Sequence, residues 1–266
     1  MQERSERTRR RLVGAGAELF HRNGYANATL GDIAGAAGVT KGALYFHFAS
    51  KDELAEAVQQ RGCALLHASV RSLREGGASP LQALIDTTHW MARMLHEDPA
   101  IPASFRITKE CAGHQPPVID FQRTWLTVVC TLLRQARDTG ELCAERRWEN
   151  AESLVAAAAC GIEGMSGTGM PYGELQRKVA ELWALLLPSV VAAGREGEYR
   201  TRAAAPLWAG AGVDPEPELE SESELEAGPG LGSGLRAELG VESESESESE
   251  GGFDGVTAGA GAGFGA

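Results

Sequence analysis

Residues 38–48 read GVTKGALYFHF and follow a shorter segment that begins at Thr29. Thr29 is a typical helix N-cap residue, and Asp32 three positions later completes a variant of the capping box. The pattern predicts a short helix over residues 30–37, ended by a glycine, and a second helix capped by Thr40. Two short helices joined by a glycine-containing turn are typical of a helix-turn-helix, whose second helix enters the major groove of DNA.

The side chains at the start of the second helix are small or able to form hydrogen bonds. Gly42 and Ala43 let the backbone come close to the wall of the groove, and Lys41 can donate to a guanine edge or a phosphate. One turn later, the aromatic ring of Tyr45 and the hydrogen-bond donor of His47 can brace the sugar-phosphate backbone. Such contacts fix the register of the protein on DNA but do not read its sequence. The predicted DNA-contacting residues are Thr29, Thr40, Lys41, Gly42, Ala43, Tyr45, Phe46, His47 and Lys51.

Leu44 and Phe48 lie four residues apart, so both side chains are expected to turn inward and hold the second helix on an earlier one. That earlier helix is predicted over residues 5–23, which end in Asn-Gly. Its apolar stripe is Leu12, Ala15 and Leu19, flanked by Val13, Gly16 and Phe20. A helical hairpin that only fills a core is the alternative interpretation of the same pattern.

Charge is distributed unevenly along the 266 residues. Residues 1–62 hold nine Lys and Arg against seven Asp and Glu, residues 63–206 hold fifteen against sixteen, and residues 207–266 hold one against fourteen. The formal net charge of −12 therefore comes from the end of the chain. Five arginines between residues 4 and 11 make the local field at the N-terminus positive, which is compatible with nucleic-acid binding there.

The remaining sequence lacks the alternation of polar and apolar residues that strands show. We expect an all-α chain of about nine helices, with a three-helix helix-turn-helix domain over residues 1–50 and a helical ligand-binding and dimerisation domain over residues 51–200. The longer apolar patterns cover residues 50–75, 80–96, 117–138, 148–165 and 172–193, and Ser50, followed by Asp52 and Glu53 in the first turn, is expected to cap the first of them. Residues 203–266, rich in Glu, Ser and Gly, are predicted to form a disordered acidic tail. The functional alternative is that this tail competes with DNA for the basic face of the protein.

Other classes of function find little support in the sequence. The five cysteines lack CxxC spacing, which indicates reduced thiols in a cytoplasmic protein. Neither a signal peptide nor an apolar run long enough for a membrane span is expected. His114 near Glu110 and Cys111 could imitate a metal or nucleophile site, but no catalytic spacing surrounds them. We expect neither an enzyme nor a cofactor. A purely architectural DNA-binding protein is a rival hypothesis, although it would not require the long helical part after residue 76.

A longer signature surrounds the two short helices. It comprises AELF at 17–20, NGY at 23–25, Thr29, DIA at 32–34, AGV at 37–39, Gly42, LY at 44–45, HF at 47–48 and KDEL at 51–54. With this signature, residues 8–54 closely resemble the DNA-binding domain of TetR-type transcriptional repressors. The resemblance implies a homodimer whose C-terminal helices bind a small molecule and control the spacing of the two recognition helices.

Three further features, VTKGALYFHFA at 39–49, Trp125 in a long helix and ELWALLLP at 181–188, resemble the γ-butyrolactone receptors of filamentous actinobacteria, which control antibiotic production. This resemblance implies that Trp125 lines the effector pocket. An indole offers flat apolar area and one N–H donor, which suits a lactone with an alkyl arm. The predicted ligand-binding residues are Trp125, Phe121, Met91, Phe105, Thr108 and Val129, with Trp90 and Met94 as further neighbours.

The sequence does not identify the residue that would bind the polar group of the effector. Several relatives carry Gln where Gly62 aligns, and Gln59 and Gln60 are expected on other faces of the helix. The alternatives are that Trp125 is ordinary core and that the effector is an antibiotic, a furan, a butenolide or another apolar molecule. The dimer interface is predicted on the Ala-rich segment 151–162 and on residues 175–190, including Trp183.

Overall fold

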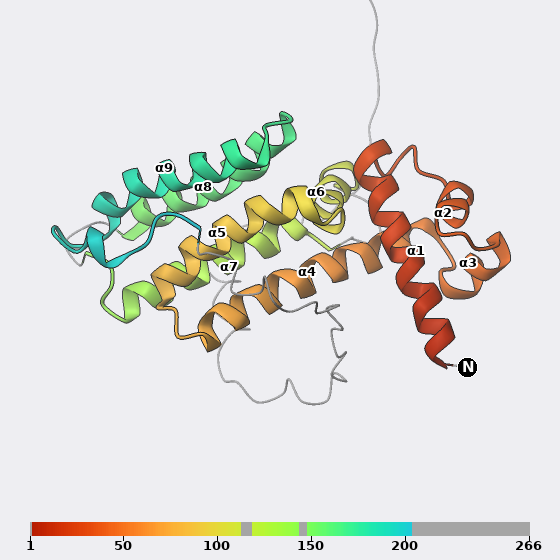
Figure 1. The fold of residues 1–266 in the computed structure, drawn as a ribbon, viewed down its shortest axis with the longest axis horizontal. Coiled ribbons are helices and arrows are strands. Elements are labelled where there is room, and N and C mark those ends of the chain that lie inside the picture. The colour runs from red at the N-terminus through yellow and green to blue at the C-terminus, as the bar shows by residue number, and fades with distance from the viewer. Residues whose placement is uncertain (1, 113–118, 144–147, 204–266) are drawn as a thin grey trace, which may run out of the picture. The chain divides into compact units, whose positions relative to one another are not determined.

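The computed structural model describes residues 2–112, 119–143 and 148–203, and all regular structure in these ranges is helical (Figure 1). The expected all-α architecture is confirmed. The elements are α1 (Gln2–Asn23), α2 (Leu30–Ala36), α3 (Lys41–His47), α4 (Lys51–Glu75), α5 (Pro80–Glu97), α6 (Ala100–Glu110), α7 (Phe121–Asp138), α8 (Trp148–Gly167), α9 (Tyr172–Val190) and the short 3-10 helix η1 (Glu196–Glu198). The described residues end at residue 203, so the predicted acidic tail lies outside them from residue 204 onward.

Helices α2, α3 and α4 begin at the N-caps that the sequence predicts. The hydroxyl oxygens of Thr29, Thr40 and Ser50 each accept a hydrogen bond of 3.1 Å from the backbone N–H three residues later. Gly38 ends the first short helix at φ +62°, a left-handed conformation that a side chain disfavours. A Cβ at Gly38 would also lie 2.9 Å from the Nη2 atom of Arg11. Local capping therefore fixes the helix-turn-helix.

The first hydrophobic core joins α1, α2 and α3 to the start of α4 and to one face of α6. Leu44 and Phe48 are buried in it, as predicted. On α1 the stripe differs from the prediction, because Ala15 and Leu19 are only partly buried. Since α1 packs against α4 and α6 as well as α2, its buried face is rotated. The buried apolar side chains of α1 are Leu12, Val13, Ala17 and Phe20.

The second hydrophobic core surrounds α5, which contacts α4, α7, α8 and α9 (Figure 1). One prediction is wrong here. Trp183 was expected on an outer dimer face, but it is 1 % exposed, and its indole N–H donates to the Thr88 hydroxyl at 2.7 Å. The face of α9 that carries Trp183 therefore packs against α5. Its neighbour Leu185 is 76 % exposed and lies on the other face.

Helix α6 is the element that the sequence patterns did not predict. It begins directly after Pro99 and has Pro102 in its first turn. Proline is tolerated there because the first N–H groups of a helix have no intrahelical acceptor. Helix α6 packs against both α1 and α4, so it connects the helix-turn-helix to the helices that follow.

The segment after α9 is fastened to α5 by polar contacts. The Arg200 guanidinium pairs with the nearly buried Asp86 carboxylate, with its Nη2 atom 2.8 Å from Oδ2 and 3.0 Å from Oδ1. Gln82 exchanges two hydrogen bonds with the backbone of Arg200, and the His89 ring bonds the carbonyl of Thr201 at 2.8 Å. Burial raises the pKa of Asp86, and the guanidinium opposes that shift.

The position of Trp183 yields a stability prediction. Trp183→Ala should lower the free energy of unfolding by about 3–5 kcal/mol, because it leaves a cavity against α5 and removes the N–H that donates to the Thr88 hydroxyl oxygen. Trp183→Phe should cost less, since it keeps most of the apolar volume. Chemical denaturation at one fixed protein concentration measures both. If Trp183→Ala left the stability unchanged but weakened the dimer, Trp183 would lie on the dimer face, as the sequence predicted.

Candidate DNA interface and effector site

Helix α3 is held by its buried side and presents its other side to solvent. Leu44 is 0 % and Phe48 is 1 % exposed, whereas Tyr45 is 57 % and Phe46 is 80 % exposed. Burying two residues four positions apart fixes the rotation of the helix, so the remaining positions face outward together. Lys41 and Gly42 lie on the exposed side, and large aromatic rings in water mark a surface that contacts a partner.

Arginines of α1 lie beside this helix. A surface depression of about 770 Å³ separates the two elements. It is lined by Arg4, Arg7, Thr8, Arg11, Gly38, Val39, Thr40, Ala43, Phe46 and His47. A concave surface that combines guanidinium groups with a helix N-terminus suits a phosphate backbone. The sequence indicated the positive field, and the structure adds which arginines adjoin α3.

Two of the N-terminal arginines also have internal contacts. Arg11 donates to the carbonyl of Ala37 at 2.5 Å and so supports the turn before α3. Arg9 lies over the Phe48 ring, with its Cζ atom 5.2 Å from the centroid. These residues therefore help to position α3 as well as contributing charge.

Several predicted DNA-contacting residues have structural partners of their own. The Lys51 ammonium donates to the carbonyls of Tyr25 and Ala26 at 2.8 and 3.2 Å and lies over the Tyr25 ring. Thr29 accepts from the Asp32 N–H, and its hydroxyl donates to the Asp32 carboxylate at 2.6 Å. Thr29 remains exposed, but Lys51 chiefly ties α4 to the segment that precedes α2.

Lys41 folds back across the start of α2. A Cβ built on Gly31 would lie 2.9 Å from the Lys41 Cε atom and 3.2 Å from its Nζ atom. Glycine at position 31 therefore leaves room for the lysine stem. The ammonium group lies near the N-terminus of α2. The helix dipole makes this end positive, so a phosphate would be a more favourable neighbour there than another cation.

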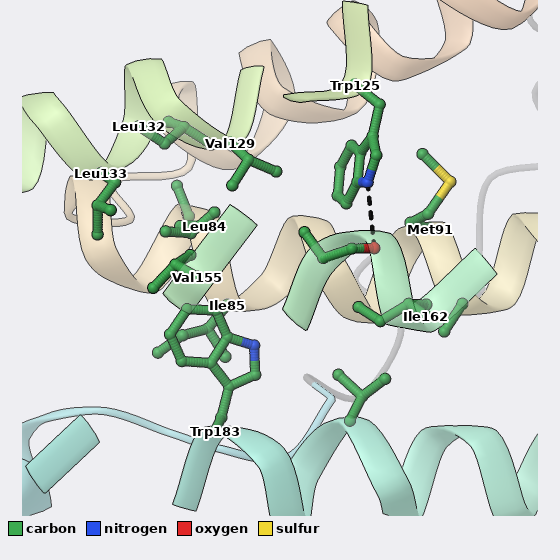
Figure 2. Packing of buried hydrophobic residues seen from close by; sticks show 14 of the residues in the cluster. Leu84, Ile85, Met91, Trp125, Val129, Leu132, Leu133, Val155, Ile162 and Trp183 are labelled. Carbon is green, nitrogen blue, oxygen red and sulfur yellow. Dashed lines mark hydrogen bonds between the residues drawn. The ribbon is translucent and has the colours of Figure 1, made fainter. Parts of the chain in front are cut away.

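The predicted ligand-binding residues gather in the second core. Trp125, Phe121, Phe105, Met91 and Val129 are all at most 1 % exposed and belong to one apolar cluster. Figure 2 shows Trp125 pointing into this cluster from α7, with its N–H directed at a backbone carbonyl. That carbonyl belongs to Ala159 of α8, at 3.3 Å. The indole donor is therefore engaged within the protein by a long hydrogen bond.

Thr108 joins the same group through hydrogen bonds. Its hydroxyl oxygen accepts from the Phe121 N–H at 3.1 Å and from the Gln59 amide at 3.1 Å. The Phe105 and Phe121 rings meet edge to face, with centroids 4.8 Å apart. The structure thus brings all six predicted residues together. Trp90 and Met94 pack around the same core and are partly buried.

The expected orientation of Gln59 is wrong. Gln59 is 0 % exposed and directs its Nε2 atom to Thr108, to the carbonyl of Ile119 at 2.6 Å and to that of Ser104 at 3.5 Å. A Cβ at Gly62 would lie 2.7 Å from the Ser104 hydroxyl, so both positions face α6. Residues three apart on a helix share a face, which places Gln59 beside Gly62. Gln60 is exposed, as expected.

Residues suspected of imitating a catalytic site have other roles. Glu110 accepts from Arg106 at 2.7 Å and from the Ala26 N–H at 3.1 Å. Burial opposes ionisation of Glu110, but these hydrogen bonds outweigh it and lower its pKa. Cys111 is buried, and burial raises the pKa of its thiol. His114 lies outside the described residues.

The described part of the chain offers neither a metal-binding cluster nor a membrane-spanning helix. Residues 2–112, 119–143 and 148–203 contain no group of three or more His, Cys, Asp or Glu side chains arranged to hold a metal ion. Within the same ranges, no helix has the length and apolar character that crossing a membrane requires.

A helix-turn-helix flanked by arginines, joined through α4 and α6 to a second helical core with a large apolar interior, defines a DNA-binding regulator with an attached sensing domain. The family described as bacterial regulatory proteins, tetR family, matches residues 12–58. The A-factor receptor protein of Streptomyces griseus is 32% identical over 195 residues, which are 73% of this chain and 67% of that protein. The chain belongs to the TetR family of bacterial regulatory proteins.

Solved structures agree with this assignment. A γ-butyrolactone receptor described as ArpA-like is 30% identical, with a TM-score of 0.61, over 73% of this chain and 94% of that one. The TetR family protein CprB from Streptomyces coelicolor, in complex with its biological operator sequence, is 32% identical, with a TM-score of 0.64, over 73% and 94%. These matches confirm the expected class, a transcriptional regulator and not an enzyme.

The exposed side of α3 yields a prediction on DNA binding. Lys41→Ala and Tyr45→Ala should each weaken operator affinity by about five- to fiftyfold, because each removes a predicted contact to the duplex and neither is part of the core. For Lys41→Ala, the slope of log affinity against log salt should also fall by about one. Fluorescence anisotropy with a labelled operator at several salt concentrations measures both quantities.

Arg137→Ala is the matched control, since it removes a positive charge from the exposed end of α7, where its neighbour Asp138 forms an ion pair with it. Affinity and salt slope should stay at wild-type values. Wild-type affinity in Lys41→Ala and Tyr45→Ala would show that α3 does not read the groove as described.

Proposed function

We propose that this protein is a dimeric transcriptional repressor that binds an operator through α3 and is released by a small apolar effector of the γ-butyrolactone type. The observation that carries the proposal is the combination of an exposed α3 with an apolar sensing core around Trp125, in a chain about one third identical to receptors of that type. The resemblance to γ-butyrolactone receptors implies that the repressor regulates antibiotic production.

Each protomer would place α3 in the major groove of one half-site. The N-terminal residues of the helix would face base edges, and the arginines of α1 would face the adjoining phosphates. Two copies related by a two-fold axis would read half-sites spaced by one helical turn or a multiple of it. The solved complex of the relative CprB with its biological operator sequence supports operator binding by this chain.

The exposed sides of α8 and α9 are the proposed dimer face. Leu154 is 47 % and Leu185 is 76 % exposed, although both are large apolar residues. Cβ atoms built at Gly161 and Gly164 would meet nothing within 4 Å, so this side of α8 offers a smooth surface for close helix packing. Figure 1 shows α8 and α9 side by side, and a second copy could bury both.

Helix α6 is the proposed route from effector to operator. Its Ser104 and Thr108 face the effector core, while its Arg106 donates to the carbonyl of His21 at 2.8 Å, at the end of α1. Glu110 accepts from the Ala26 N–H in the segment between α1 and α2. An effector that displaces α6 would therefore move the helix-turn-helix and change the half-site spacing.

Two alternatives share the same α3. A TetR-type regulator that answers to an antibiotic or another apolar ligand would differ in the identity of the effector only. An effector-independent DNA-binding protein would leave the core around Trp125 without a ligand. A gel shift on the DNA upstream of its own gene, with a synthetic γ-butyrolactone, an organic culture extract or neither, separates these three cases.

The effector core yields a prediction on release. Trp125→Ala should bind the operator as wild type does, since Trp125 lies outside the helix-turn-helix. It should, however, need at least about tenfold more γ-butyrolactone for release, because the ring supplies most of the apolar contact. Titration of the preformed operator complex measures this concentration. Trp183→Phe, a change to the other buried tryptophan of this core, should leave the releasing concentration unchanged. A normal releasing concentration in Trp125→Ala would refute the location of the pocket.

The proposed dimer face yields a prediction on dimerisation. Leu154→Glu combined with Leu185→Glu should weaken dimerisation by at least about a hundredfold, since burying unpaired carboxylates at an interface is costly. Sedimentation equilibrium measures the dimer constant, and far-UV circular dichroism should show an unchanged helix content. Thr127→Glu combined with Gln135→Glu, at two exposed positions of α7, adds the same two negative charges and should dimerise normally. An unaltered dimer constant in the double variant would exclude this face.

A further inference from the structure

Gln59 carries a buried hydrogen-bond acceptor that none of the described residues uses. The side chain is 0 % exposed, and no donor among the described residues reaches its Oε1 atom. Buried polar atoms nearly always have a partner, because leaving one unpaired loses its hydration without replacement. We infer that Gln59 Oε1 accepts a hydrogen bond from a hydroxyl group of the effector. This inference rests on the function proposed above.

The orientation of the amide is fixed by its nitrogen. Nε2 lies 2.6 Å from the Ile119 carbonyl, a contact that requires a donor, and 3.1 Å from the Thr108 hydroxyl oxygen, which can pair with either amide atom. The Ile119 carbonyl can only accept, so exchanging the two amide atoms would place two acceptors against each other. Oε1 therefore points away from Ile119.

The surroundings specify the chemistry of the ligand. Gly62 brings the backbone of α4 so close to α6 and α7 that a Cβ there would lie 2.7 Å from the Ser104 hydroxyl and 3.2 Å from the Phe121 ring. The Phe105–Phe121 pair adds flat apolar area beside the amide. A neutral hydroxyl on an apolar body matches this combination, whereas an ammonium group would lose its hydration for a single neutral acceptor.

Helix α7 relates this acceptor to Trp125. Phe121 and Trp125 lie four residues apart, so they share one face of the helix. Phe121 lies toward Gln59 on the α4 and α6 side, and the Trp125 indole N–H points toward α8. The effector would therefore lie along this face, with its hydroxyl at α4 and its apolar body across the two rings.

The test compares two synthetic probes that differ only in the donor. One is a γ-butyrolactone with an alkyl chain and a single free hydroxyl, and the other is its O-methyl ether. The full-length dimer should bind the free hydroxyl about tenfold more tightly by isothermal titration calorimetry, as expected for one buried hydrogen bond. Gln59→Met, which keeps the length of the side chain, should reduce this preference to less than about twofold by weakening the hydroxyl probe.

Gln60→Leu is the matched control. Gln60 is exposed, and its amide nitrogen donates to the carboxylate of Glu56 at 3.3 Å, on the surface of α4. It should keep the tenfold preference. Equal binding of both probes to the wild-type protein, or a full preference retained in Gln59→Met, overturns the role of Gln59 and leaves the proposed function standing. Failure of the wild-type protein to bind either probe overturns both. The wild-type comparison decides the matter even if Gln59→Met does not fold.

Discussion

Helix α6 packs into two hydrophobic cores at once, and the rest of the structure depends on this constraint. Ala100, Ala103 and Ile107 belong to the core of the helix-turn-helix, whereas Ile101 and Phe105 belong to the core that contains Trp125. Well-packed interiors resist continuous deformation, so a displacement of one face of α6 has to be accommodated on the other. Together with α4, this short helix therefore connects the core around Trp125 to the helix-turn-helix.

Polar contacts reinforce that junction. Arg106 and Glu110 hold each other at 2.7 Å and reach the end of α1 and the Ala26 N–H. Gly24 is favoured by its φ of +85°, and it leaves room for the ends of both side chains, which would lie 2.6 Å from a Cβ there. The glycine that ends α1 thus also determines how α6 meets the helix-turn-helix.

The sequence predicted what local chemistry controls. The caps at Thr29, Thr40 and Ser50 and the inward turn of Leu44 and Phe48 follow from short-range rules. The resemblance to a known family located Trp125, and helix faces alone supplied its neighbours; the structure brings these residues together, and their roles are proposals.

The errors arose where packing partners decide. Helix α6 was not predicted because two prolines open it, and α9 is apolar on two sides, so periodicity could not tell which side carries the core. Gln59 was placed on another face from Gly62, although i and i+3 positions are neighbours. Only the position of α6 reveals that both residues meet it.

The polar fastening of residues 200 and 201 onto α5 has a practical consequence for shortened versions of the chain. A truncation that ends at Tyr199 would remove the guanidinium from Asp86 and strand a carboxylate that is 8 % exposed. It would also take the carbonyl acceptor from His89. A minimal version for crystallisation should therefore stop no earlier than Thr201, even though the acidic region begins only a few residues later.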